Sequence, residues 1–379
     1  MFEIAIMLLP VAAASGWYVA SKHYHSKEKS SSSEHDGYFK GLNFLLNEQP
    51  DKAISVFIDL LEVDDETIEV HLALGTLFRQ RGEVEKAIRL HQNLIARPQI
   101  NQQARSNALN ELGLDYMRAG LLDRAENIFL ELEKDTVFRV HAVKQLLSIF
   151  QQEKEWQQAI DYTFKLEMMG AGKQPVLLSQ LHCELALLHK KQGDDVAVRN
   201  DLKKALRIDS SCVRANVISA ELAVEKSDYK HALKLIMAIS KQDKRFIPVY
   251  LNLILTCFDQ IGKPKAKFNF LADLQAGNDS TIVMSRFIDV LVEQKSSKEA
   301  ATFLHKRLLE NPNQGYLRLY AKIGDENGDT ESSFLRNIIQ NFEEKPISFE
   351  CKNCGFSSVE LNWYCPSCKQ WGTTKPVVV

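Results

Sequence analysis

The sequence carries no excess of charge of either sign. It has 47 lysines and arginines against 49 aspartates and glutamates, a formal net charge of −2. Nucleic-acid-binding proteins usually carry a clear basic excess, because neutralising phosphates supplies much of their affinity. The balance therefore argues against this class and leaves open only a local basic patch.

Common catalytic and nucleotide-binding motifs are also missing. The chain has no G-x-x-x-x-G-K-[ST] phosphate loop, no G-x-S-x-G nucleophile turn and no H-E-x-x-H metal motif. No pair of carboxylates stands out from the ordinary charge of exposed helical faces. The sequence gives no sign of an enzyme, and we predict a binding protein.

The seven cysteines do not have the pattern of a disulfide framework. Cys183, Cys212 and Cys257 are scattered through apolar, helix-like stretches, where a cysteine is usually a small buried hydrophobic residue. The other four are crowded into the last thirty residues as two C-x-x-C pairs. Thiols grouped for a metal and otherwise unpaired indicate a reducing compartment.

One long apolar run lies near the N-terminus. Residues 4–20 read IAIMLLPVAAASGWYVA, and a helix of this length rises about 26 Å, close to the minimum for crossing the hydrocarbon layer. A cleaved signal peptide is the rival interpretation, but it needs positive charge before the run, and only Glu3 precedes it. Basic residues follow instead, from Lys22 onward. We therefore predict an uncleaved anchor over residues 1–21, with the N-terminus outside and the rest of the chain in the cytoplasm.

Three small residues in this run have the spacing of a helix-packing face. Ala12, Gly16 and Ala20 follow one another at intervals of four, which lets a second membrane helix approach closely. The anchor then recruits a partner, or a second copy of the chain as a homodimer; a passive tail is the alternative. Residues 22–36 are rich in serine and charge, which predicts a flexible tether.

The body of the chain, residues 37–342, repeats every 34 residues. In most units a small residue lies inside a helical pattern and a large apolar residue usually follows four positions later. The series is Ala53/Phe57, Ala87, Ala125/Phe129, Ala159, Val198/Leu202, Ala232/Ile236, Ala266/Phe270, Ala300/Leu304 and Phe334/Ile338. Six of its eight steps equal 34, and insertions near residues 98–101 and 170–175 account for the two longer ones.

Small residues and turn glycines agree with this period. A second small residue often occurs twelve positions earlier, as at Gly75 and Gly113, and glycines such as Gly82 and Gly120 fall between helices, where a turn needs positive φ. This is the tetratricopeptide (TPR) pattern of two antiparallel helices per unit. We predict an all-α solenoid of about nine helix pairs.

A solenoid buries its small and large residues between neighbouring repeats. Residues that bind partners should therefore project from the concave groove or from loops. Arg79, Asp123 and Arg124 are our candidates. Each also has a structural alternative, since Asp123 is placed to cap a helix and exposed charge is common on helical faces.

After residue 342 the helical pattern stops, and residues 343–379 form a cysteine-rich knob. Cys351 and Cys354 make the first C-x-x-C pair, and Cys365 and Cys368 make the second. Each pair can form a knuckle whose backbone N–H groups point at the sulfurs, and two facing knuckles give a tetrahedral S4 site for one Zn²⁺ or one iron ion. A thioredoxin-like redox pair is the alternative, but no βαβ pattern surrounds either motif.

So short a segment cannot bury enough core to fold alone, and we expect the metal to carry its stability. Its aromatic residues Phe349, Phe356, Trp363, Tyr364 and Trp371 are more than a small knob can hide. We expect some of them to dock on the last repeat.

Several stretches together resemble the lipopolysaccharide assembly protein B (LapB) family of Gram-negative bacteria. They are LLPVAAASGWY in the anchor, GLNFLLNEQPDKAI, LFRQRGEVEKAIRLHQ and DYMRAGLLDRAE in the first three repeats, and CKNCGF with WYCPSCKQWGTTKP in the tail. The repeats around 170–211 match least well. Each knuckle is similar to those of rubredoxin, although the gap between the pairs is short and Lys369 replaces the glycine expected after the last thiol.

The resemblance implies an inner-membrane protein with its bulk in the cytoplasm. Such proteins restrain lipopolysaccharide synthesis by helping the membrane protease FtsH degrade the deacetylase that commits precursor to lipid A, and they coordinate synthesis with other inner-membrane assembly proteins. It also implies rubredoxin-like iron on the four thiolates, with zinc as the alternative. Two other functions stay open, a rubredoxin-like electron carrier and a general chaperone or assembly factor for a membrane complex.

Overall fold

The computed structural model describes residues 17, 43, 68–98, 100–277, 280–326 and 347–377. The chain divides into two compact units, Met1–Ile149 and Phe150–Val379. The two units are described separately below.

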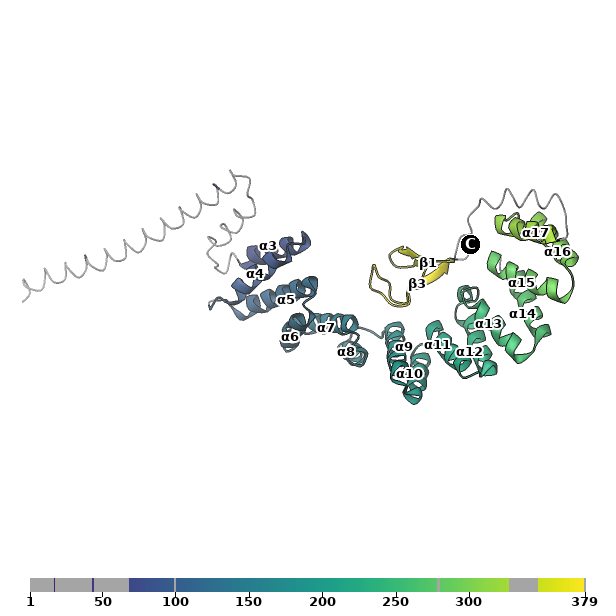
Figure 1. Cartoon of the computed structure of the whole chain (residues 1–379). Helices are drawn as coiled ribbons and strands as arrows, with labels where there is room; N and C mark the ends of the chain where they lie inside the picture. The colour runs from purple at the N-terminus through teal and green to yellow at the C-terminus, as the bar shows by residue number, and fades with distance from the viewer. Residues whose placement is uncertain are drawn as a thin grey trace, which may run out of the picture. The chain divides into compact units, whose positions relative to one another are not determined.

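The described part of the first unit consists of consecutive helices, of which the first four pack each on the next (Figure 1). They are α3 (Ile68–Gln80), α4 (Val84–Ile95), α5 (Gln102–Ala119), α6 (Leu122–Leu132) and the first part of α7 (Arg139–Glu153).

The second unit continues the same pattern of helix pairs. Its helices are α8 (Trp156–Met168), α9 (Pro175–Gln192), α10 (Asp195–Ile208), α11 (Val213–Glu225), α12 (Tyr229–Gln242), the 3₁₀ turn η1 (Lys244–Phe246), α13 (Leu251–Ile261), α14 (Pro264–Ala276), α15 (Thr281–Gln294), α16 (Ser297–Glu310) and α17 (Gln314–Glu326). The all-α TPR prediction is confirmed for the described repeats.

Small residues hold the paired helices close together. The small residues Ala87 and Ala125 are fully buried, and so is the large residue Phe129. A methyl group placed on Gly113 would lie 2.7 Å from the Phe129 ring, and one on Gly75 would lie 2.3 Å from the ring of His91. The two small positions of each unit are therefore small because a neighbouring helix occupies the space of a side chain.

Turn chemistry sets the helix boundaries. Gly120 has φ of 75°, and its N–H bonds to the last carbonyls of α5, as a left-handed C-cap does. Asn101 caps the start of α5 by accepting a hydrogen bond from the Ala104 N–H. The loops 96–101 and 169–174 between helices accommodate the two insertions that lengthen the repeat.

The C-terminal knob is a three-stranded antiparallel sheet in the order β2-β1-β3. Its strands are β1 (Ser348–Cys351), β2 (Ser357–Ser358) and β3 (Thr374–Val377). Cys351 pairs with Thr374, and Phe349 pairs with both Ser358 and Pro376. Because β1 is the central strand, it ties the first cysteine pair to the end of the chain.

The anchor, its packing residues Ala12, Gly16 and Ala20, the tether and the first repeat lie outside the described residues, apart from positions 17 and 43. So do the predicted boundaries at residues 21, 36 and 342, which stay predictions. None of the helices in the described part of the chain has both the length and the apolar character that crossing a bilayer requires.

Candidate metal centre and partner-binding residues

The two C-x-x-C segments fold into matching knuckles. In the first, the Gly355 N–H bonds back to the Cys351 carbonyl at 2.9 Å, and Gly355 has φ of 75°. In the second, the Lys369 N–H bonds to the Cys365 carbonyl at 3.0 Å, and Lys369 has φ of 58°. Lys369 therefore adopts the left-handed conformation that glycine provides in the first knuckle, and its departure from the rubredoxin pattern leaves the turn unchanged.

The knuckles bring the four predicted thiols together. The Cys351 and Cys368 sulfurs are 3.7 Å apart, as are those of Cys354 and Cys365, and all four lie within 4.8 Å of one another. Sulfurs placed tetrahedrally at about 2.3 Å from one ion are about 3.8 Å apart. The four cysteines thus have the spacing of an S4 site for a single zinc or iron ion, and the geometry does not distinguish the two metals.

The surroundings of these thiols differ. The Thr373 hydroxyl lies 3.2 Å from the Cys351 sulfur, and together with backbone N–H groups of the knuckle it lowers the pKa of Cys351 to about 6. Burial raises the pKa of Cys365 to about 11, although knuckle N–H groups oppose this. A cation among the sulfurs would favour the thiolate form of all four.

Trp363 fixes one side of the knob to the repeats. Its ring stacks on Phe246 of η1 with centroids 5.5 Å apart and planes 8° apart. The Arg214 guanidinium of α11 lies 6.0 Å from the Trp363 ring centroid, and Arg214 is itself buried and paired with Glu184 at 2.7 Å. Leu361 packs with Trp363 against the apolar core around α11, η1 and α13.

Trp371 fixes the other side. Its indole N–H donates to Gln151 Oε1 at 2.7 Å, and its ring meets the edge of Trp156 at 6.3 Å. Nearby, a methyl group added to Gly372 would lie 3.0 Å from a Val176 methyl. Trp363 and Trp371 therefore dock the knob on the helices, as expected of its aromatic residues, and docking of others on the last repeat stays a prediction because most of that repeat lies outside the described residues. Among the described residues the docking contacts lie on α7 to α9, α11 and η1, where Arg214 and Phe246 supply the matching surface.

Arg79 lies in a network of ion pairs on the first unit. Its guanidinium bonds to Glu111 at 2.7 Å and to Asp115 at 2.9 Å, and Asp115 in turn bonds to His91 at 2.5 Å. Burial opposes the charge on Glu111, but hydrogen bonds from Arg79 and Thr76 outweigh it and lower the pKa of Glu111. Arg79 therefore holds α3 against α5, and its role in partner binding stays a prediction.

Asp123 and Arg124 are both exposed at the start of α6. Leu121, not Asp123, is the N-cap residue, and no side chain caps this end. Asp123 lies in the first turn, where its charge complements the helix dipole. Arg124 lies 5.7 Å from the ring centroid of Tyr116. No contact among the described residues joins Asp123 or Arg124 to Arg79, so the three candidates do not form one site there.

Two models of known families match this chain. A model described as a rubredoxin metal binding domain covers residues 349–376, and a tetratricopeptide repeat model covers residues 70–103. Fold and cysteine geometry therefore define a TPR protein with a rubredoxin-type metal-binding domain.

Full-length relatives make the assignment narrower. Lipopolysaccharide assembly protein B of Escherichia coli K12 is 35% identical over 389 residues, covering 100% of this chain and 98% of the relative. The protein of the same name from Haemophilus influenzae is 31% identical, again over 100% of this chain and 98% of the relative. This chain belongs to the lipopolysaccharide assembly protein B family. A solved TPR protein from Parabacteroides merdae is 13% identical, covers 73% of this chain and 100% of its own, and has a TM-score of 0.35.

Proposed function

We propose that this chain is a non-enzymatic scaffold in lipopolysaccharide assembly that holds partner proteins at the cytoplasmic face of the inner membrane. The full-length relatives named for lipopolysaccharide assembly carry the proposal. A surface of stacked helix pairs supports a binding role, because repeats of this kind present extended surfaces to other proteins. The partners are the membrane protease FtsH and the deacetylase that commits precursor to lipid A, together with other inner-membrane assembly proteins.

The mechanism is a tether combined with a docking surface. The segment 1–21 restricts the scaffold to the membrane that carries the protease. Confining scaffold, protease and substrate to one surface raises their effective concentration without any new chemistry. The described repeats then select the substrate.

The metal site contributes stability to this surface. Cys351, Cys354, Cys365 and Cys368 would hold one ion, which cross-links β1 to both knuckles. A segment this short depends on such a cross-link for its fold. Only a folded knob presents Trp363 to the repeats, so the ion stabilises the docked arrangement indirectly.

Affinity capture from membranes tests the proposal. Full-length protein should retain the protease and the deacetylase, whereas a Cys351→Ser, Cys354→Ser variant should lose at least one of them. Cys257→Ser is the matched control, because Cys257 lies in α13 and is not one of the four cysteines whose sulfurs come together. Recovery of a broad set of unrelated clients would instead indicate a general chaperone.

Deletion of residues 1–21 tests the tether separately. The truncated protein should keep its helical circular dichroism spectrum and should no longer accelerate turnover of the deacetylase in cells. Turnover of the deacetylase as fast as with the full-length protein would show that the tether is not required. An electron carrier would need iron–thiolate absorption that is lost on dithionite reduction, whereas the scaffold functions with zinc in the same site.

A further inference from the structure

Two cysteines outside the metal site face each other in the second unit. Cys183 lies in α9, Cys212 is the N-cap residue of α11, and both are free thiols. Their side chains lie in the apolar core where α9, α10 and α11 meet, with the two sulfurs 3.9 Å apart. A disulfide bond is about 2.05 Å long, so the sulfurs need to approach by only about 1.8 Å to form one.

The two thiols differ in reactivity. Cys212 lies at the N-terminus of a helix, where backbone N–H groups favour a thiolate. Interactions with the Cys183 thiol and with the Ala215 N–H outweigh burial and lower the pKa of Cys212 to about 7. The Cys212 thiol and burial raise the pKa of Cys183 well above its usual range. Near neutral pH, Cys212 is therefore the nucleophile of the pair and Cys183 is protonated.

Their access to solvent differs in the same sense. Cys212 is 3% exposed and follows the exposed residue Ser211, whereas Cys183 is 0% exposed. A peroxide is close to water in size, so a small local opening at the start of α11 is enough to admit it. Cys183 needs no contact with an oxidant, because a resolving thiol attacks only the oxidised sulfur of its partner.

The pair is connected to the surface that holds the knob. Gln180 Nε2 donates to the Cys212 sulfur at 3.7 Å, and Gln180 Oε1 accepts a hydrogen bond from Arg214 at 3.3 Å. The Arg214 guanidinium lies 6.0 Å from the ring centroid of Trp363 and 5.8 Å from that of Trp371. The Cys212 sulfur therefore shares a hydrogen-bonding partner with the arginine that contacts both docking tryptophans.

We propose that Cys183 and Cys212 form a reversible disulfide when the protein meets a peroxide, and that this disulfide loosens the knob from the repeats. The Cys212 thiolate attacks one peroxide oxygen and breaks the O–O bond. This leaves a sulfenic acid on Cys212 and a hydroxide, which takes up a proton to become water. The Cys183 sulfur then attacks the Cys212 sulfur, its proton leaves with the hydroxyl group as a second water, and the S–S bond forms. Two thiols are oxidised and one peroxide is reduced to two waters.

Formation of the bond disturbs the position of Arg214. The Cys212 sulfur moves towards α9 and away from the Gln180 amide, which displaces the N-terminus of α11. Because a protein core is close-packed, Arg214 in the first turn of α11 shifts from its place beside the two tryptophan rings. A disulfide of this kind, formed transiently and reversed by exchange with thiols, is the usual one in a reducing compartment. The proposal does not depend on the proposed scaffold function, since it concerns only the docking of the knob.

Mass spectrometry of purified full-length protein treated with hydrogen peroxide tests the chemistry. A non-reduced digest should contain a peptide cross-linked between Cys183 and Cys212, and dithiothreitol should remove it. The Cys183→Ala variant should instead accumulate a sulfenic acid on Cys212 that dimedone labels. Absence of the cross-linked peptide at a peroxide concentration that already oxidises the thiols of the metal site would overturn the proposal.

Hydrogen exchange tests the effect on docking. The amides of β3 and η1, which contact each other, should exchange about fivefold faster or more in the cross-linked wild type, as expected when one cation–π contact is weakened. Cys212→Ser cannot form the disulfide, and serine is a favoured N-cap residue, so this variant should fold. Its exchange should respond to peroxide only through damage at the metal site, which the wild type shares. Equal acceleration in both proteins, or none in the cross-linked wild type, would overturn the proposal.

Two further variants complete the test. Cys257→Ser is the matched control, because Cys257 is a buried thiol of α13 that packs with Ala223 and Ala232. It should form the cross-link and accelerate exchange as the wild type does. If circular dichroism shows that Cys212→Ser fails to fold, Cys183→Ala takes its place, since it too lacks the disulfide. An accelerated exchange of β3 and η1 in oxidised Cys183→Ala equal to that of the wild type would show that the bond itself is not what loosens the knob.

Discussion

Replacing Trp363 by alanine should release the knob from the repeats without removing its metal. The side chain is half-buried and packs against the core around η1 and α11. Losing about 100 Å² of apolar contact costs about 2.5 kcal/mol. Losing the stacked ring contact with Phe246 adds about 0.5–1 kcal/mol. A total of about 3 kcal/mol raises the undocked population about a hundredfold.

Hydrogen exchange measured by mass spectrometry detects this change. In the Trp363→Ala variant, the backbone amides of β1 and η1 should exchange faster, while the metal content per chain should equal that of the wild type. Val359→Ala is the control, because Val359 lies in the same knob and is 66% exposed. It should leave the exchange rates unchanged.

Two results would refute this reasoning. Unchanged exchange at η1 would show that Trp363 contributes little to docking. Loss of the metal together with docking would show that the knob depends on the repeats for its fold, and not on its four thiolates.

Three further changes test other parts of the structure. Gly75→Ala places a methyl group 2.3 Å from the ring of His91 and should lower the free energy of unfolding by about 1–3 kcal/mol in urea titrations. The control is Gly277→Ala, whose added methyl group meets nothing within 4 Å. It should change the free energy of unfolding by less than about 0.5 kcal/mol. Lys369→Gly relieves a left-handed backbone with φ of 58° and should raise the free energy of unfolding of the knob, measured by denaturant titration, by about 1 kcal/mol. A lower free energy of unfolding would contradict this. Burial lowers the pKa of His182, although Asp201 opposes the shift. As the pH falls, the unfolded state therefore binds a proton at this histidine before the folded state does. The contribution to the free energy of unfolding that is present above about pH 6.5 is then lost, by at most about 1.4 kcal/mol per pH unit. His182→Gln should flatten this dependence in urea titrations at several pH values, and a control change at the exposed His231 should not.

The repeats were predictable because their determinants are local and recur. Each unit places a small residue where the next helix passes, so Ala87 and Ala125 could be assigned to the core from their spacing alone. The metal site was predictable for a similar reason, since a C-x-x-C knuckle closes within five residues, as the bond from Gly355 to Cys351 shows.

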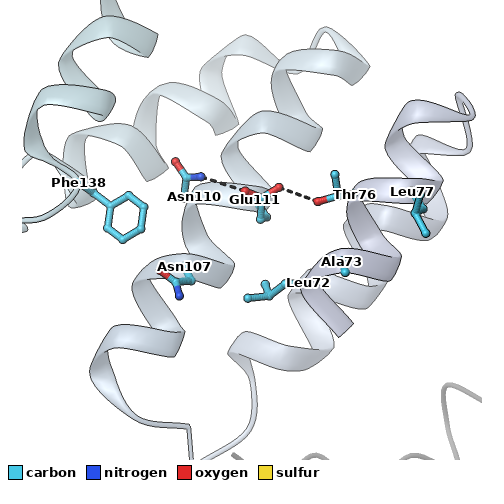
Figure 2. A pocket seen from close by; sticks show the side chains of 8 residues that line it. All are labelled: Leu72, Ala73, Thr76, Leu77, Asn107, Asn110, Glu111 and Phe138. Carbon is cyan, nitrogen blue, oxygen red and sulfur yellow. Dashed lines mark hydrogen bonds between the residues drawn. The ribbon is translucent and has the colours of Figure 1, made fainter. Parts of the chain in front are cut away.

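The docking site of the knob could not be predicted in this way. The hydrogen bond from Trp371 to Gln151 spans 220 residues, and no periodicity in the sequence links the two positions. A pocket between α3 and α5 of the first unit (Figure 2) was also not predicted, although a signal exists. Asn110 precedes Gly113 by the same three residues that separate Leu72 from Gly75, so counting back from each small residue identifies side chains on one common face.

The register of the knob's sheet brings its two ends together. Ser348, at the start of β1, pairs with Val377, at the end of β3. A segment whose ends meet can be moved between proteins as a cassette, since grafting it requires only one short gap in the host. Such a graft would carry the four thiolates with it, but Gln151, Arg214 and Phe246 would stay behind. In a foreign host Trp363 and Trp371 would be uncovered, and the cassette would be prone to aggregation unless both were made polar.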